Sequence, residues 1–274
     1  MEDKIVYERY AIRTRDLRLR RPTLYPAELI AQSSRLNAGY TSICKPFSSS
    51  TFRNLDYKAF SRLNSLMDSL ILASSSPRRR EILTTLGIPF SIIEPDIDET
   101  AHDHLPPEER VIRISEQKGY KARDLYDGSA SLYFKTLCYS RLILSADTLV
   151  AVEDWDYKTW TTIGKPSSRD EAREMLKILS GRTHRVFTGM TLLDCRTGFP
   201  YSQTVAASVT FAPMTEEEIS WYLDSNEWKG VAGAYQIQGK GSLFIESIEG
   251  SWSCVMGLPI RELYGMLRDV RFSF

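Results

Sequence analysis

A row of three serines, a proline and three arginines, Ser74–Arg80, stands where a short apolar run gives way to a helix signal. Pro77 at the first helical position and Gly87 beyond the last one are typical of a helix between them. The N-terminus of a helix carries unpaired N–H groups and a partial positive charge, so it binds anions. Three arginines in the first turn oppose that charge and destabilise the helix unless an anion offsets them. The pattern therefore favours a phosphate-binding turn over a solvated basic helix start.

Carboxylates stand at two places in the chain where they could hold a divalent cation. Asp96, Asp98 and Glu99 follow an apolar, β-rich run, and alone they are typical of a plain acidic turn. Asp147 differs because it interrupts the apolar run Leu142–Val152, where an aspartate is costly to bury without a partner. Carboxylate oxygens suit Mg²⁺, which bridges them to substrate phosphates. A functional role is therefore favoured for Asp147 even when it is considered alone.

Two isolated lysines and a glycine-rich segment complete the candidates. Lys165 lies between a glycine and a proline, on a segment that should be stiff and extended. Lys118 lies in a predicted long helix, where surface charge is the simpler interpretation. The glycines of Ala232–Gly241 allow a backbone to approach a ligand or to turn sharply. A simple hairpin is the alternative for that segment.

The elements that must hold these residues alternate between strand and helix signals. Strand signals fall on Leu70–Ser74, Phe90–Glu94, Leu142–Val152, His184–Leu193, Tyr201–Phe211 and Ser242–Ile248. Helix signals begin at Ser76, Pro106, Ser168, Thr215 and Pro259. Two of these helices begin with the Ser/Thr-x-x-Glu pattern of a capping box. Alternating elements with two hairpin-like pairs predict an α/β domain with a mixed sheet.

The overall composition excludes several classes of protein. Among 274 residues, 42% are hydrophobic, and 35 basic residues cancel 35 acidic ones, so a nucleic-acid-binding coat is not expected. No apolar run approaches the roughly 18 residues that a membrane helix needs, so we expect no membrane association. The four cysteines form no CxxC pair, which excludes a compact zinc module. They also favour a reducing compartment, and we expect a cytoplasmic protein.

The charge is distributed unevenly, because residues 1–70 contain twelve Lys and Arg against seven Asp and Glu. An Arg- and Ser-rich segment with few acids is typical of an organelle presequence, but Glu2 and Asp3 at the very start argue against one. The alternatives are a solvated tail or a wrongly extended gene prediction. We therefore expect an N-terminal extension, 1–69, without stable structure, and a folded domain, 70–274.

Taken together and in order, these motifs resemble the Maf family of nucleoside triphosphate pyrophosphatases. The matching stretches are Leu70–Leu83, Asp96–Thr100, Leu144–Val150, Gly164–Pro166, Leu179–Gly189, Ala232–Gly241 and Val255–Pro259. The resemblance covers 70–274 and none of 1–69. It implies the ITPase-like α/β fold, a long curved mixed sheet with flanking helices and a cleft between two lobes, often found as a homodimer.

The resemblance also implies roles for individual residues. The implied catalytic residues are Asp147 as proton acceptor, with Glu99, Lys165 and Lys118. The implied substrate-binding residues are Ser74, Arg78, Arg79, Thr148 and Gln238. Glu99 and Asp147 are the implied ligands of a divalent cation, Mg²⁺ or Mn²⁺. The chain departs from the family in the long helix, where the usual Lys-Ala is Lys118-Gly119.

The implied reaction is hydrolysis of dTTP and UTP, and of modified pyrimidine nucleotides, to the monophosphate and diphosphate, a housecleaning activity. Uracil and thymine present one N–H donor between two acceptors, and the amide of Gln238 carries both a donor and an acceptor to complement that edge. One alternative is a 7-methyl-GTP pyrophosphatase. Another is a nucleotide-binding regulator of cell division or septum formation, although a pure binder needs no water-activating group such as Asp147.

Overall fold

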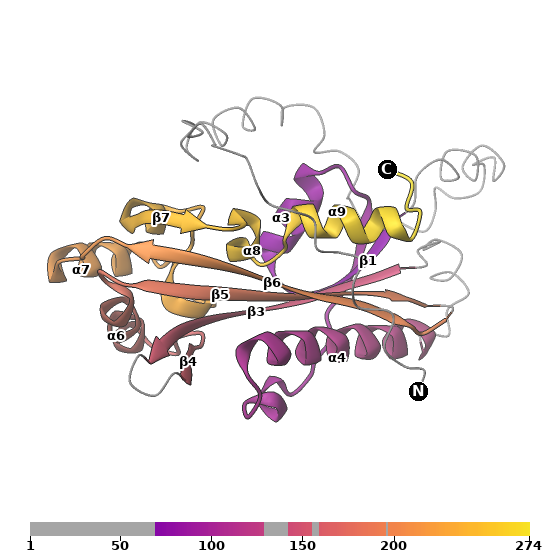
Figure 1. Ribbon diagram of the computed structural model, residues 1–274, viewed down its shortest axis with the longest axis horizontal. Helices are drawn as coiled ribbons and strands as arrows, with labels where there is room; N and C mark the ends of the chain where they lie inside the picture. The colour runs from indigo at the N-terminus through magenta and orange to yellow at the C-terminus, as the bar shows by residue number, and fades with distance from the viewer. Residues whose placement is uncertain (1–68, 129–141, 155–158, 196) are drawn as a thin grey trace, which may run out of the picture. The chain divides into compact units, whose positions relative to one another are not determined.

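The computed structural model describes residues 69–128, 142–154, 159–195 and 197–274 (Figure 1). The predicted extension 1–69 lies outside these residues except for Ser69. The predicted loop 127–140 also lies outside them, except for its first two residues, which continue the preceding helix. Among the described residues, no helix combines the length and the apolar character needed to cross a membrane.

Seven strands among the described residues form one mixed sheet. They are β1 (Leu70–Ala73), β2 (Phe90–Ile93), β3 (Leu142–Asp154), β4 (Thr159–Ile163), β5 (Thr183–Asp194), β6 (Pro200–Phe211) and β7 (Ile245–Glu249). The order is β2-β1-β3-β5-β6-β7, and β4 pairs with β3. Strand β1 is parallel to both β2 and β3, whereas the other pairs are antiparallel. The predicted α/β class with a long mixed sheet is therefore confirmed.

Helices cover both faces of this sheet. The α-helices are α3 (Pro77–Thr85), α4 (Pro107–Gly128), α6 (Arg169–Leu179), α7 (Glu216–Asp224), α8 (Trp252–Met256) and α9 (Ile260–Asp269). The described residues also form the 3₁₀ turns η2 (Glu99–His102), η3 (Ala232–Ala234) and η4 (Lys240–Phe244). Figure 1 shows α4 along one face of β3, β5 and β6, with α3, α8 and α9 on the opposite face.

Strand β3 separates the two layers of the core by the alternation of its side chains. Leu144 and Ala146 belong to the large cluster on the side of α3 and α9, whereas Ile143 and Leu149 belong to smaller clusters that face α4. Because successive side chains of a strand point to opposite faces, Asp147 lies on the α4 side and Thr148 on the other. Asp147 and Thr148 are therefore adjacent in β3 but face opposite layers of the core.

Helix α4 lies directly on the sheet because small residues separate them. A Cβ added at Gly189 of β5 would lie 2.4 Å from the carbonyl oxygen of Val111 in α4. A Cβ added at Gly119 would lie 3.0 Å from Oγ of Ser145 in β3. Ser145 Oγ donates a 2.6 Å hydrogen bond to the carbonyl oxygen of Ser115. This close packing fixes the height of Lys118 above β3.

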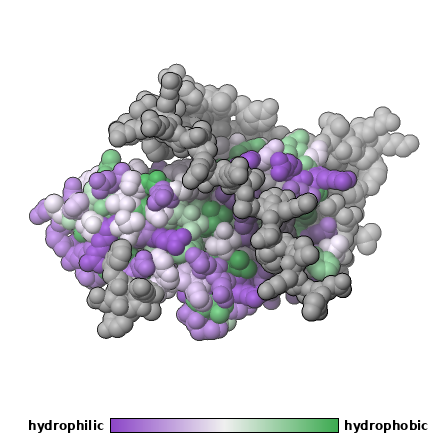
Figure 2. Space-filling model, viewed as in Figure 1, coloured by the Kyte–Doolittle hydropathy of each residue, from purple (hydrophilic) through white to green (hydrophobic). Residues whose placement is uncertain are grey.

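The surface of the described part is mostly polar on the face drawn in Figure 2, with hydrophobic residues scattered among hydrophilic ones. The most exposed large hydrophobic side chains are Phe199 and Leu243, on different elements. Scattered apolar residues of this kind are normal on a protein surface.

Local signals were confirmed unevenly. The capping box of α7 is complete, whereas that of α6 is half formed because Glu171 binds Ser167 instead of the N-cap residue. The predicted strand Ser242–Ile248 is wrong at its start, since residues 242–244 belong to η4 and β7 begins at Ile245. The five-residue helix α8 was not predicted. The glycine-rich segment forms 3₁₀ turns, with Gly233 at φ 72°, and its hairpin alternative is wrong.

Candidate active site

Two strands, β1 and β4, pair with different parts of the same edge of β3, and a gap separates them. Strand β1 pairs with Leu142–Ser145, and β4 pairs with Val150–Asp154. Between them, Ala146–Leu149 have no partner on this edge among the described strands, while β5 continues along the other edge. A cavity of about 340 Å³ opens at this gap, beside the carboxyl end of β1. Ligands of α/β proteins bind at such places, where the strand connections switch direction.

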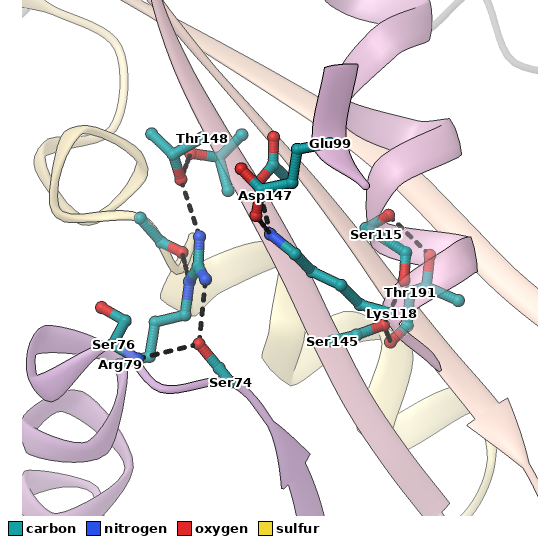
Figure 3. Close-up of polar contacts among 12 residues, drawn as sticks. Ser74, Ser76, Arg79, Glu99, Ser115, Lys118, Ser145, Asp147, Thr148 and Thr191 are labelled. Atoms are coloured by element: carbon teal, nitrogen blue, oxygen red, sulfur yellow. Dashed lines mark hydrogen bonds and ion pairs between the residues drawn. The ribbon is translucent and has the colours of Figure 1, made fainter. Parts of the chain in front are cut away.

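A lysine joins the two predicted carboxylates at the gap (Figure 3). Lys118 Nζ, from α4, lies 2.7 Å from Asp147 Oδ1 and 2.6 Å from Glu99 Oε1. The side chains of Lys118 and Asp147 are 11% and 8% exposed, so this ion pair is largely shielded from water. The partner that the buried aspartate requires is therefore Lys118, and the departure at Gly119 has not displaced it.

Glu99 is held in the lining of the cavity by the turn that begins with it. Asp98 caps η2 by accepting hydrogen bonds from the N–H and the hydroxyl of Thr100. Burial opposes ionisation of Glu99, but the positive charges of Lys118, Lys165 and Arg79 outweigh it and hold the pKa of this carboxyl below its ordinary value. Glu99 is therefore ionised at neutral pH.

Arg79 connects the serine–arginine turn to β3 and to the loop after α8. Its Nε donates to the carbonyl oxygen of Gly257 at 2.7 Å, Nη1 to Ser74 Oγ at 3.0 Å, and Nη2 to Thr148 Oγ1 at 3.1 Å. Burial lowers the pKa of Arg79 to about 10, although the nearby carboxylate of Asp147 opposes the shift. Three of its five N–H groups are thus committed inside the protein, which leaves two for a ligand.

The N-terminus of α3 is not capped by the side chain of its N-cap residue, Ser76. Ser74 Oγ accepts from the N–H of Ser76 at 3.2 Å, and burial lowers the pKa of Arg78. Ser74, Ser76 and Arg78 all line the cavity. The predicted anion-binding turn is therefore in the same cavity as the carboxylates.

The remaining predicted site residues also line the cavity. Lys165 is exposed on the segment after β4, and the carbonyl oxygen of Gly164 accepts from the N–H of Gly233 at 3.1 Å. Gln238 lines the cavity beside Gln236, to which its amide donates a hydrogen bond. The nine residues predicted as site residues thus lie around one cavity: Ser74, Arg78, Arg79, Glu99, Lys118, Asp147, Thr148, Lys165 and Gln238.

The cavity is also lined by residues that were not predicted as site residues, among them Arg110, Ile114, Tyr235 and Gln236. Arg110 and Ile114 precede Lys118 by eight and four positions on α4, so helical periodicity could have placed them on the same face. Gln236 carries no comparable signal, because two glutamines in a turn are ordinary surface residues. Tyr235 lines the wall too and contacts His184 Nε2 at 2.8 Å.

The donor set suits a divalent cation that binds together with a phosphate ligand. Among the described residues, no group of three His, Cys, Asp or Glu side chains converges. Glu99 and Asp147 nevertheless each place a carboxylate oxygen within 2.7 Å of the same ammonium group, so one cation can reach an oxygen of each. Mg²⁺ commonly takes one or two carboxylates and completes its shell with water and phosphate oxygens. The residues therefore fit Mg²⁺ held with a nucleotide, not a preformed protein cage.

The mixed sheet with a carboxylate–lysine site facing an anion-binding turn defines the class, and the chain belongs to the Maf-like protein family, whose profile matches residues 69–270. It is similar to a dTTP/UTP pyrophosphatase of Treponema denticola, with 43% identity over 211 residues that cover 75% of this chain and 98% of that protein. It is also similar to a dTTP/UTP pyrophosphatase of Syntrophus aciditrophicus, with 40% identity over 205 residues, 75% of this chain and 91% of that protein. A nucleoside-triphosphatase (dITP/XTP pyrophosphatase) structure from Mycobacterium abscessus aligns with 74% of this chain and 95% of its own at 10% identity and a TM-score of 0.32.

Proposed function

We propose that this protein is a nucleoside triphosphate pyrophosphatase that hydrolyses dTTP and UTP to the monophosphate and pyrophosphate. The observation that carries the proposal is the position of Lys118 between Asp147 and Glu99, opposite the open N-terminus of α3. Relatives at 43% and 40% identity bear the name of this activity and are covered almost completely by the match.

In this proposal the triphosphate binds across the gap at the edge of β3. The N–H groups at the start of α3, the hydroxyl of Ser74 and the guanidinium of Arg78 contact phosphate oxygens through charge-assisted hydrogen bonds. Lys165 approaches from the segment after β4. Arg79 contributes positive charge, but its main task is to hold Ser74 and Thr148 in place, because three of its N–H groups already bind the protein.

Asp147 accepts a proton from the attacking water in this proposal. Its Oδ1 accepts from Lys118, which fixes the orientation of the carboxylate. General base catalysis of this kind contributes typically about 10²–10⁴-fold in rate. Lys118, Arg78 and Lys165 offset the charge that develops on the phosphate oxygens.

A divalent cation, Mg²⁺ or Mn²⁺, is part of the proposal. Glu99 and Asp147 would hold it, and when bound it would neutralise charge on the bridged phosphate oxygens. Glu99 is suited to this task because its depressed pKa keeps it ionised at neutral pH. Lys118 would then contact phosphate or keep one of the two carboxylates in position.

Three further parts of the proposal concern the whole chain. We propose a homodimer, a cytoplasmic location, and a catalytic domain 70–274 that works without residues 1–69. Sedimentation tests the first and localisation of a tagged chain tests the second. Pyrophosphate release by a variant that lacks residues 1–68 tests the third, and loss of that activity would contradict it.

The test of the activity is pyrophosphate release from a panel of triphosphates, with Mg²⁺ and with a chelator. We expect UTP and dTTP to exceed GTP and CTP in kcat/KM, and chelation to stop turnover. Preference for 7-methyl-GTP would assign the protein to the alternative substrate. Release from none of the triphosphates, with nucleotide binding retained, would overturn the proposal and favour a nucleotide-binding regulator.

A further inference from the structure

Two glutamines form a short relay of amides in the wall of the cavity. Gln236 and Gln238 both line the cavity, and Ile237 between them packs into the large core cluster. Gln236 Nε2 donates to the carbonyl oxygen of Glu227 at 2.8 Å. Gln238 Nε2 donates to Gln236 Oε1 at 3.2 Å. The two side chains are therefore coupled to each other and to the backbone.

The order of donors and acceptors in this relay is set at its far end. A backbone carbonyl oxygen can only accept, so the group that Gln236 turns toward Glu227 has to be its NH₂ group. Its Oε1 then faces Gln238, which has to donate a hydrogen bond from its own NH₂ group. The orientation of the Gln238 amide is thus dictated by Glu227 through Gln236, although an isolated amide could adopt either orientation.

Gln238 Oε1 is left as a buried acceptor without a hydrogen bond from the described residues. A buried acceptor without a partner is destabilising, and a ligand donor removes that cost. Because this oxygen is covered in the ligand-free protein, a base that binds to it has to shift the side chain slightly. The hydrogen bond gained by the unpaired oxygen favours that shift.

We infer that Gln236 is a positioning residue that selects uracil and thymine over cytosine by fixing the acceptor of Gln238 toward the base. This inference rests on the proposed function and deepens it. Uracil and thymine carry an N–H donor at ring position N3, which pairs with a carbonyl oxygen. Cytosine carries a bare acceptor at the same position, so two acceptors would face each other. UTP and CTP are otherwise nearly identical in size and in charge.

The test compares kcat/KM for UTP with kcat/KM for CTP in two variants of Gln236. Gln236→Met keeps the length of the side chain and removes both its donor and its acceptor, so the Gln238 amide is free to rotate. We expect the UTP/CTP ratio to fall by about tenfold, the usual effect of one mismatched hydrogen bond. Gln236→Glu loses the hydrogen bond to the carbonyl oxygen of Glu227 but can still only accept from Gln238, so we expect the ratio to fall less than in Gln236→Met.

Controls separate orientation of the amide from damage to the loop. Gln203→Met, on β6 and outside the cavity, should leave the ratio unchanged. Affinity for inorganic tripolyphosphate, which has no base, should be the same in the wild type and in Gln236→Met. An unchanged ratio in Gln236→Met would overturn the inference, and so would an equal fall in both Gln236 variants.

A binding measurement distinguishes failure of the inference from failure of the proposed function. Calorimetry with α,β-methylene UTP and α,β-methylene CTP measures the base preference without hydrolysis. Equal affinity of the wild type for both analogues would overturn the inference while leaving pyrophosphate release, and with it the proposed function, intact. A preference for the uridine analogue that disappears in Gln236→Met supports the inference even if no triphosphate is hydrolysed.

Discussion

Two parts of the cavity lining are built from different kinds of interaction. In the first part, the floor, Lys118, Asp147 and Glu99 come from three separate elements and are joined by short ion pairs in a partly buried place. In the second part, the wall, Gln236 and Gln238 are neutral, lie two residues apart and are joined by one hydrogen bond. In the proposed function the floor stabilises charge, and the wall distinguishes one neutral base from another. Changes at the floor should therefore alter the rate by orders of magnitude, whereas changes at the wall should alter a ratio of rates.

The largest effect is expected from Asp147→Asn. The amide keeps the shape of the side chain but cannot accept a proton, so turnover of UTP should fall by about 10²–10⁴-fold. Steady-state pyrophosphate release measures this loss, and circular dichroism with thermal unfolding checks the fold. A variant that kept a tenth of the wild-type rate would show that Asp147 is not the proton acceptor.

Lys118→Met should have the next largest effect, a loss of about 10²-fold or more in kcat/KM, because it leaves two carboxylates close together without their ammonium group. Without Lys118 the pKa of Glu99 should rise, since a principal charge that lowers it is gone. The acid side of the pH–rate profile should therefore move to higher pH. A profile whose acid side stays in place would contradict the role of Lys118 as the partner of Glu99.

The same ion pair predicts how stability depends on pH. A carboxyl whose pKa is depressed in the folded state stabilises the fold above its unfolded-state pKa, about 4.3 for glutamate. That stabilisation is lost as the pH falls through the folded-state value. Urea unfolding at a series of pH values should show a smaller loss below this region in Lys118→Met than in the wild type. Identical curves would mean that Lys118 does not perturb Glu99.

Lys165→Ala should weaken binding of a triphosphate by about tenfold at low salt, because it removes one charge that offsets the phosphates. Lys165 is exposed, so salt should screen its contribution and the loss should shrink as ionic strength rises. Calorimetry with α,β-methylene UTP at two salt concentrations measures it, with uridine as the uncharged control. An equal loss for uridine would show that Lys165 does not contact phosphate.

The smallest effect concerns the support of the floor. Gly119→Ala places a Cβ 3.0 Å from Ser145 Oγ, so it should be about 1 kcal/mol less stable than a helical Gly→Ala change without such a contact, and it should lower the rate several-fold. Adding Ser145→Ala removes the contact, so the double mutant should be less destabilised than the sum of the single ones. Gly265→Ala, in α9 with open space around it, is the matched control and should be neutral or stabilising. Additive effects would mean that the two residues are not coupled.

One residue of the floor, Asp147, and the serine–arginine turn could be predicted from their own surroundings in the sequence. Asp147 stood out because an aspartate in an apolar strand needs a partner, and the serine–arginine turn stood out because its charges oppose the helix dipole. The partner of Asp147 could not be identified in this way, because Lys118 comes from a helix and the contact depends on Gly119 and Gly189 bringing that helix close to the sheet. The sequence pattern alone favoured surface charge for Lys118.

The wall was less predictable, for a physical reason. Its turns have no period, so the glycine-rich segment could equally be a hairpin, and the strand after it was predicted to begin too early. The orientation of Gln238 depends on Gln236 and on a carbonyl oxygen nine residues before Gln236, at Glu227. The direction of hydrogen bonds between neutral side chains leaves no signal in composition or charge. The features that could be predicted were charged residues at positions where a charge is unfavourable, such as Asp147 in an apolar strand.

In the proposed function, the Asp147–Lys118–Glu99 floor catalyses hydrolysis of the α–β phosphoanhydride of a pyrimidine triphosphate. Hydrolysis of UTP in ¹⁸O-labelled water, with products identified by mass spectrometry in the wild type and in Asp147→Asn, tests it most directly. We predict UMP and pyrophosphate as the only products, one ¹⁸O atom per turnover, and their near absence in the variant. Formation of UDP and phosphate, or equal rates of product formation in the two proteins, would contradict it.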